Sequence, residues 1–117
     1  MNSKIIIVKL TPNDTGETGS HQVGVYILKK YVESRFFPPL DERKKNPREK
    51  IPFYDENGKK WELTYIHYNN KFFKGTRDEY RLTPFNHFAE KNYLKAGDEV
   101  HFYKDDNSKY RIKIIKK

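Results

Sequence analysis

The sequence predicts a mainly β protein, an open or closed barrel of about seven strands with two short helices at its ends. Short apolar or alternating runs are separated by turn-forming residues along the whole chain, with no internal repeat or low-complexity tract. A length of 117 residues suits one domain with a single modest core, so we expect one domain over residues 1–117. An aromatic content of 15% argues against disorder.

The first half of the chain predicts two strands and a helix. Four consecutive β-branched residues make Lys4–Leu10 a strand that is buried on both faces or closes a barrel. A polar loop leads to a second strand at Gln22–Leu28. Lys29–Phe37 has apolar residues at helical spacing, and Pro38-Pro39 ends that helix because proline cannot donate the next hydrogen bond. Asp41–Lys50 is a charge-dense connector.

The middle of the chain contains the clearest hairpin. Asn57-Gly58 is a strong turn signal between the strands Ile51–Tyr54 and Lys60–Tyr68, and apolar and polar residues alternate along the second of these. Asn69-Asn70 ends that strand. Phe72-Phe73 is then expected to anchor the following segment in the core.

The last third predicts a polar loop, a second helix and two strands. The polar loop is Lys74–Arg81, and Thr83-Pro84 can open a helix that runs to about Lys91, with threonine as cap and proline at the first position. Turns at Leu94–Asp98 and 105–108 then frame the closing strands, which we expect at 99–103 and 110–115.

Charge and composition narrow the classes of function. Lysine and arginine outnumber aspartate and glutamate by 24 to 16, a net charge of +8 that suggests a polyanionic partner such as nucleic acid. The chain has no cysteine, which excludes disulfides, thiol catalysis and cysteine-based zinc sites. No apolar run is long enough to span a bilayer, so we expect no membrane partner and a cytoplasmic location.

Catalytic motifs are weak. The four histidines are far apart in sequence, and no serine–histidine–acid or phosphate-cradling motif is visible. Glu42-Arg43-Lys44, with Asp14 or Asp41 upstream, has the spacing of metal-dependent nucleases, and Gly24-Val25-Tyr26 resembles half of the GIY-YIG nuclease signature. A small nuclease is therefore an alternative hypothesis, although a proline-flanked loop is a poor support for a metal site.

Two polar loops are better candidates for a binding surface. Residues 13–26 combine three glycines with carboxylate, amide, hydroxyl and imidazole groups, which suits a shaped loop that reads hydrogen-bonding edges. Lys71–Arg81 mixes basic with acidic residues. A simple phosphate clamp has no use for acids, whereas base readout does, because carboxylates accept from cytosine and arginine bonds guanine. The alternative is a pair of solvated loops with internal salt bridges, each worth about 0–1 kcal/mol.

Three segments resemble a known family. Asn13–Ile27 closely resembles the Asp-Thr-Gly…Gly-His-Gln-Val-Gly segment of the N-terminal effector domain of EcoRII-like restriction endonucleases, of EcoRII or UbaLAI type. Tyr68–Thr83 resembles the later Tyr-Asn…Phe-Gly-Lys-Thr-Arg-Asn-Glu-Lys-Arg segment of that domain. Leu94–Phe102 is similar to a strand entry of the plant B-three DNA-binding pseudobarrel. Together these segments and their spacing cover most of the chain.

The resemblance implies a seven-stranded DNA-binding pseudobarrel that grips the major groove of double-stranded DNA with two arms. It implies a Type II endonuclease, of the IIE type that needs a second site copy, whose separate nuclease domain would hold the Mg²⁺. The site would be CC(A/T)GG or a similar G·C-rich sequence. For this domain it implies no cofactor, no catalysis and a monomer in a prokaryotic cytoplasm. A transcription-factor or RNA-binding barrel of the same fold is the remaining alternative.

The arms would be the first polar loop, Asn13–Gln22, and the second polar loop, Asn69–Arg81. His21, Tyr26, Arg77, Glu79 and Arg81 match binding positions of the family. Three positions depart from its pattern, namely Lys74-Gly75 in reversed order, Tyr80 in place of a lysine and Ser20 in place of a glycine. The candidate binding residues are Asn13, Asp14, Thr15, Glu17, Ser20, His21, Gln22, Tyr26, Asn69, Asn70, Lys71, Lys74, Arg77, Asp78, Glu79, Tyr80 and Arg81.

Overall fold

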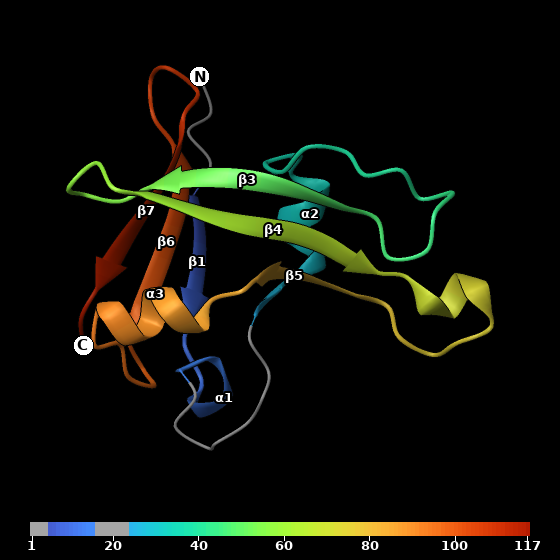
Figure 1. The fold of residues 1–117 in the computed structure, drawn as a ribbon, viewed down its shortest axis with the longest axis horizontal. Helices are drawn as coiled ribbons and strands as arrows, with labels where there is room; N and C mark the ends of the chain where they lie inside the picture. The colour runs from blue at the N-terminus through green and yellow to red at the C-terminus, as the bar shows by residue number, and fades with distance from the viewer. Residues whose placement is uncertain (1–4, 16–23) are drawn as a thin grey trace.

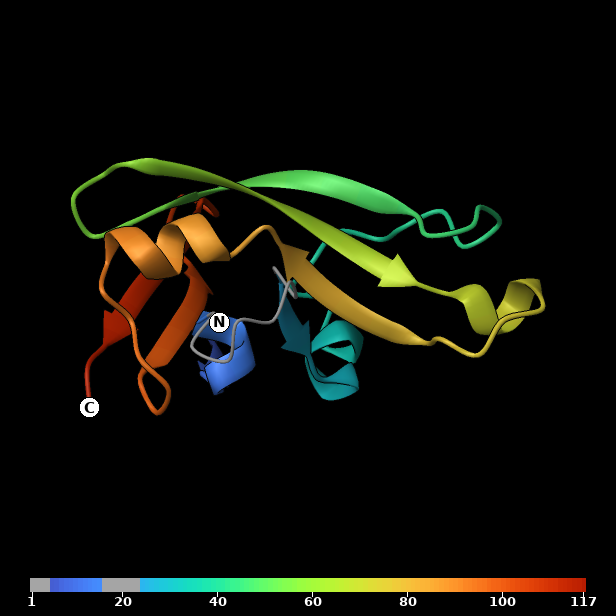
Figure 2. The same ribbon diagram turned by 60° about the horizontal axis from the view of Figure 1, so that its bottom comes forward.

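The computed structural model describes residues 5–15 and 24–117, and its main feature is one seven-stranded sheet that curls into a nearly closed barrel (Figures 1 and 2). The strand order is β1-β6-β7-β3-β4-β5-β2, and every neighbouring pair is antiparallel except β3 and β7. This confirms the predicted fold class. The strands are β1 (Ile5–Lys9), β2 (Val25–Ile27), β3 (Arg48–Tyr54), β4 (Lys60–Tyr68), β5 (Glu79–Thr83), β6 (Glu99–Lys104) and β7 (Tyr110–Ile115).

Short helical segments lie between the strands. The two expected helices are present as α2 (Lys29–Glu33) and α3 (Asn86–Lys91), and two shorter turns that the sequence did not predict are α1 (Pro12–Thr15) and the 3-10 turn η1 (Asn70–Phe73). No helix among the described residues is long and apolar enough to cross a membrane.

The core fills the inside of the barrel. Aromatic rings from separate strands meet there edge to face, for example Phe53 of β3 and Phe102 of β6, whose ring centroids are 5.3 Å apart. Along β4 the predicted alternation is confirmed, because Leu63, Tyr65 and His67 are buried. The outward-pointing Ile66 is buried as well.

Several predicted boundaries were wrong. The first helix ends at Glu33 and not at Phe37, because Arg35 adopts a positive φ of 63° that no α-helix contains. The second begins at Asn86, because Thr83 is held in β5 opposite Thr64, and a residue before proline favours extended backbone. Strand β3 begins at Arg48, three residues before the expected start, as its pairing with Ile66 extends the hairpin.

Two burial predictions were also wrong. Within residues 5–15 and 24–117, β1 is an edge strand that pairs with β6 alone, and Ile5 and Ile7 are exposed while Ile6 is buried. Phe72 and Phe73 are not core anchors. Their rings are exposed on η1, which projects away from the barrel at one end of the molecule (Figures 1 and 2).

Candidate nucleic-acid interface

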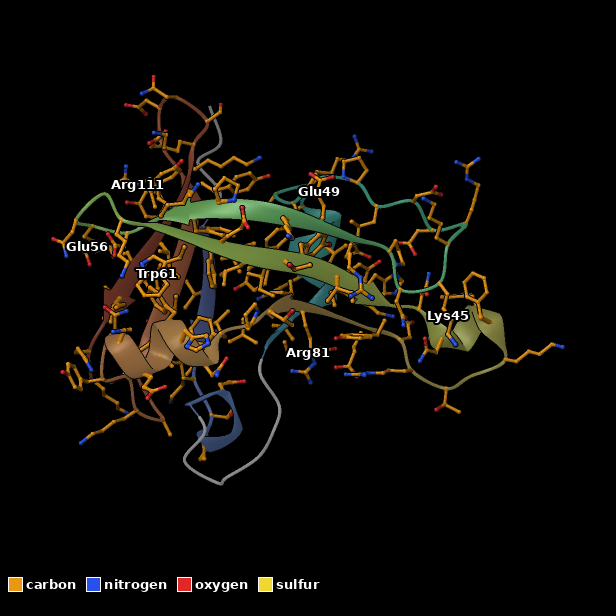
Figure 3. The ribbon with its side chains drawn as sticks, viewed as in Figure 1. Lys45, Glu49, Glu56, Trp61, Arg81 and Arg111 are labelled. Carbon is orange, nitrogen blue, oxygen red and sulfur yellow. The ribbon has the colours of Figure 1, made fainter. Side chains whose placement is uncertain are left out.

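The candidate interface is the outer face of the β2–β5–β4 part of the sheet. Arg81 of β5 lies opposite Tyr26 of β2 and opposite Ile66 of β4, while Glu79 lies opposite Tyr68. Because side chains alternate along a strand, Glu79 and Arg81 share the outer face, and Tyr80 and Leu82 point inward. Figure 3 shows Arg81 beside β5, between the barrel and the projecting second polar loop.

Three residues on this face form an arginine clasp, defined as Arg77, Glu79 and Arg81. Arg77 Nε donates to Glu79 Oε1 at 2.9 Å, and Arg81 Nε donates to Glu79 Oε2. Hydrogen bonds from Arg77 and Arg81 hold the pKa of the Glu79 carboxyl below its usual range. The carboxylate therefore stays ionised and fixes both guanidinium groups on one side of β5.

The two arginines of the clasp are held differently. The guanidinium of Arg77 lies over the Tyr68 ring, 3.8 Å from its centroid, and its side chain is 44% exposed. Arg77 is anchored to Glu79 through Nε, and this bond does not use its two terminal nitrogens. The side chain of Arg81 is only 14% exposed, and its Nη1 donates to the carbonyl of Gly24 at 3.0 Å. Arg81 thus links β5 to Gly24, the residue that directly precedes β2.

Gly24 is required by close packing. A Cβ at this position would lie 2.3 Å from Thr83 Cγ2 and 2.8 Å from the carbonyl oxygen of Leu82. The absence of a side chain lets β2 start directly against β5. The strip of β5 between Glu79 and Thr83 therefore has Gly24 packed beside Thr83 at one end and the second polar loop entering at Glu79 at the other.

Behind the clasp, on the inner side of the sheet, lies a histidine network, defined as Glu42, His67 and Asp78. His67 Nδ1 lies 2.7 Å from Glu42 Oε1, and Nε2 lies 2.8 Å from Asp78 Oδ1. Each ring nitrogen of His67 therefore lies within hydrogen-bonding distance of a carboxylate oxygen, so the ring is held from both sides. The ring stacks on Tyr80 with centroids 3.9 Å apart.

The network fixes the end of the second polar loop. Asp78 also accepts from Lys29 Nζ at 3.1 Å, and the bonds from His67 and Lys29 lower the pKa of its carboxyl. The charged connector, Asp41–Lys50, is also hydrogen-bonded to the second polar loop. The buried amide of Asn69 accepts from the backbone N–H of Asn46 at 2.7 Å and donates to the carbonyl of Lys44 at 2.8 Å.

Several predicted residues thus have structural partners. Tyr80 points inward between His67 and Tyr65, and burial raises the pKa of its hydroxyl, so it is not placed beside Arg77 and Arg81 as a contact residue. Asp78 and Asn69 are engaged within the protein. Lys71, Lys74 and Arg77 are exposed, and Asn70 is half-buried in η1.

The first polar loop is described only at its two ends. Asp14 Oδ2 accepts from the backbone N–H of Thr11 at 2.9 Å within α1. Asn13 and Thr15 belong to α1, and Tyr26 is exposed on β2. The predictions for Glu17, Ser20, His21 and Gln22 lie outside the described residues.

Sequence reasoning missed the supporting role of His67, Glu42 and Lys29. His67 was recognised only as one residue of an alternating strand, and Glu42 only as a nuclease candidate. A partial signal was available, since a histidine at a core-facing position of a strand needs polar partners when buried. Which partners it finds depends on contacts 25 and 11 residues away along the chain.

The acidic residues of the nuclease hypothesis do not form a cluster. Asp41 pairs with Arg43, Glu42 pairs with His67, and Asp14 lies in α1. Across residues 5–15 and 24–117 no group of three or more histidine, aspartate or glutamate side chains is arranged to hold a metal ion.

Comparison with known proteins gives the family. Residues 2–100 match the family described as "Restriction endonuclease EcoRII, N-terminal". The chain belongs to this family. Over 97 residues, 80% of the chain, it is 36% identical to the Type II restriction enzyme EcoRII of Escherichia coli, of which the match covers 24%. It is also 28% identical over 106 residues to auxin response factor 3 of Oryza sativa, of which 13% is covered. The chain therefore spans a quarter or less of these relatives.

Solved structures share the fold of this EcoRII N-terminal family member. The Arabidopsis FUS3–DNA complex matches with a TM-score of 0.75 and 23% identity, covering 97% of this chain and 98% of that one. The Arabidopsis thaliana LEC2–DNA complex matches with a TM-score of 0.71 and 17% identity, covering 97% and 96%. The pseudobarrel expected from the sequence is confirmed by this likeness.

Proposed function

We propose that this chain is a sequence-specific double-stranded DNA-binding module, the target-recognition domain of a Type II, IIE-type restriction endonuclease. The observation that carries the proposal is the arginine clasp on the outer face of β5, which the second polar loop enters at Glu79. The family supports it, as do the FUS3 and LEC2 structures, which are DNA complexes. In this proposal cleavage and Mg²⁺ binding belong to a separate nuclease domain, for which the EcoRII relative has room because it is about four times longer than the matched segment.

In this proposal the two polar loops enter the major groove as arms, and the domain acts as a monomer without a cofactor. The major groove is wide enough for a loop or ribbon and presents a distinct pattern for each base pair. Arg77 offers its terminal nitrogens to guanine O6 and N7, while Glu79 holds the guanidinium in place. Arg81 and Tyr26 border the groove face, and Lys71 and Lys74 contact phosphates.

Binding to defined duplexes tests the proposal. We expect a CC(A/T)GG duplex to bind more tightly than scrambled duplexes of equal composition at moderate salt, measured by fluorescence anisotropy. Equal affinities would refute sequence-specific recognition of this site. Selection of bound duplexes from a random library then distinguishes another G·C-rich site from a general affinity for DNA.

Arg77→Ala separates base reading from general attraction. The variant should lose about 1–3 kcal/mol of binding to the preferred duplex and relax one position, with little change on scrambled DNA. Arg77→Lys is the matched control for charge, because lysine keeps the charge but not the planar fork that bonds guanine twice. Equal loss on all duplexes would show that Arg77 acts only as a phosphate contact.

The nuclease alternative is tested with the same protein. Incubation with Mg²⁺ and supercoiled plasmid should leave the plasmid uncut, and nicking that disappears in Glu42→Gln would support the alternative.

A further inference from the structure

Two adjacent exposed phenylalanines lie at the tip of the second polar loop. Phe72 is 67% exposed and Phe73 is 39% exposed, and both belong to η1, the segment that projects farthest from the barrel in Figure 2. Single exposed apolar residues need no explanation, but two adjacent phenylalanines at a projecting tip suggest contact with a ligand.

This exposure is built into the loop. The backbone N–H of Lys71 donates to the carbonyl of Arg77 at 2.9 Å, and that of Gly75 donates to the carbonyl of Asn70 at 2.7 Å. The N–H of Phe72 donates to the carbonyl of Asn69 at 3.0 Å. These bonds close the loop into a defined shape that holds the rings in solvent.

Packing inside the loop supports the same conclusion. A Cβ on Gly75 would lie 2.9 Å from the carbonyl oxygen of Asn70, so the two sides of the loop are already in tight contact. The buried side chain of Asn69 fastens the base of the loop to Lys44 and Asn46. The tip is therefore preorganised, which reduces the entropy lost when it binds a partner.

The charges around the tip indicate a polyanionic partner. Lys71 and Lys74 flank the two rings and are exposed, and the connector residues Arg43, Lys44 and Lys45 are exposed beside the base of the same loop. A protein partner would need a matching acidic surface around an apolar pocket. Duplex DNA supplies phosphates at the rim of a groove whose floor carries one apolar feature, the thymine C5-methyl group.

We propose that Phe72 is a DNA-contacting residue that packs against a thymine methyl group in the major groove, while Lys71 and Lys74 reach the flanking phosphates. The inference rests on the proposed function and extends it, because it adds an apolar contact to the polar reading by the arginine clasp.

The test is a thermodynamic cycle between Phe72→Ala and thymine→uracil substitution, which removes only the C5-methyl group. Affinities of both proteins are measured on the preferred duplex and on its uracil counterpart. We expect Phe72→Ala to weaken binding to the thymine duplex about tenfold. Uracil should weaken the wild type by a similar factor and the variant by much less. Independent effects of the two changes, or no effect of Phe72→Ala, would overturn the inference.

Two controls make the result specific. Tyr93→Ala removes an aromatic side chain that is 81% exposed and follows α3, outside the second polar loop, and should leave both affinities unchanged. The melting temperature of Phe72→Ala should equal that of the wild type, since an exposed ring adds little to stability. If the wild type binds all duplexes with equal affinity, the proposed function and this inference are both refuted. If the wild type prefers one duplex and Phe72→Ala binds that duplex as tightly as the wild type does, only the inference is refuted.

Discussion

Replacing His67 with phenylalanine tests whether the histidine network holds the second polar loop. Phenylalanine keeps a ring that can stack on Tyr80, so packing is largely preserved. The substitution removes both hydrogen bonds, the one to Glu42 and the one to Asp78. The variant therefore isolates the polar contribution of the network.

The expected magnitude follows from the exposure of the two carboxylates. A net hydrogen bond to a charged group is worth about 1.5–3 kcal/mol. Glu42 is 48% exposed and regains hydration, so losing its bond to His67 costs only about 0–1 kcal/mol of stability. Asp78 is 17% exposed but keeps Lys29 at 3.1 Å, which leaves a loss in the lower half of the range. We expect a total of about 2 kcal/mol, or a fall in Tm of about 8 °C.

Urea unfolding followed by circular dichroism and by the fluorescence of Trp61 measures this change. Hydrogen exchange adds a local readout, because the amides of Lys71 and Gly75 are bonded within the loop and should lose protection more than amides of β6. The control is His87→Phe, which places the same ring at an exposed position of α3 and should change stability by less than about 0.5 kcal/mol. A variant with wild-type stability and unchanged loop protection would refute the role of the network.

Three further predictions follow from the site. Gly24→Ala should destabilise the protein by about 1–3 kcal/mol in urea unfolding. A second substitution, Thr83→Ala, should restore part of the lost stability, because Thr83 Cγ2 is the atom nearest to the added Cβ. Full stability in the single variant would contradict the close packing. Lys74→Ala should weaken binding to all duplexes alike and lower the slope of log Kd against log salt by about one, whereas Lys113→Ala on β7 should leave the slope unchanged. The carboxyls of Asp78 and Glu79 have lowered pKa values in the folded protein. The stability that they contribute is therefore present above the ordinary carboxyl pKa and is lost as pH falls through the folded values. Asp78→Asn should flatten the decline of the urea midpoint below about pH 4, and an unchanged decline would contradict the assignment.

Local sequence determined much of the fold. The Asn57-Gly58 turn and the alternation along β4 specified the central hairpin, and Gly58 adopts the positive φ of 80° that such a turn needs. Boundaries were less well predicted where tertiary pairing competes with local preference. Thr83 has the features of a helix cap, yet strand pairing with Thr64 keeps it in β5. Phe72-Phe73 has the composition of a core segment, yet both side chains are exposed.

The sequence by itself determined the fold class, six of the seven strands and the resemblance that the family comparison confirmed, since turn residues, alternation and motif spacing are properties of neighbouring positions. Strand β5 (Glu79–Thr83) was missed, because its first residues were assigned to the polar loop Lys74–Arg81. Only the tertiary structure decided which side of β5 faces outward, and with it that Arg77, Glu79 and Arg81 form one clasp while Tyr80 turns inward to His67. The physical reason is that alternation fixes which residues share a face of a strand, but the partners across the sheet decide which face is buried. The histidine network depends on the same long-range pairing, because Glu42, His67 and Asp78 meet only after β4, β5 and the charged connector have packed together.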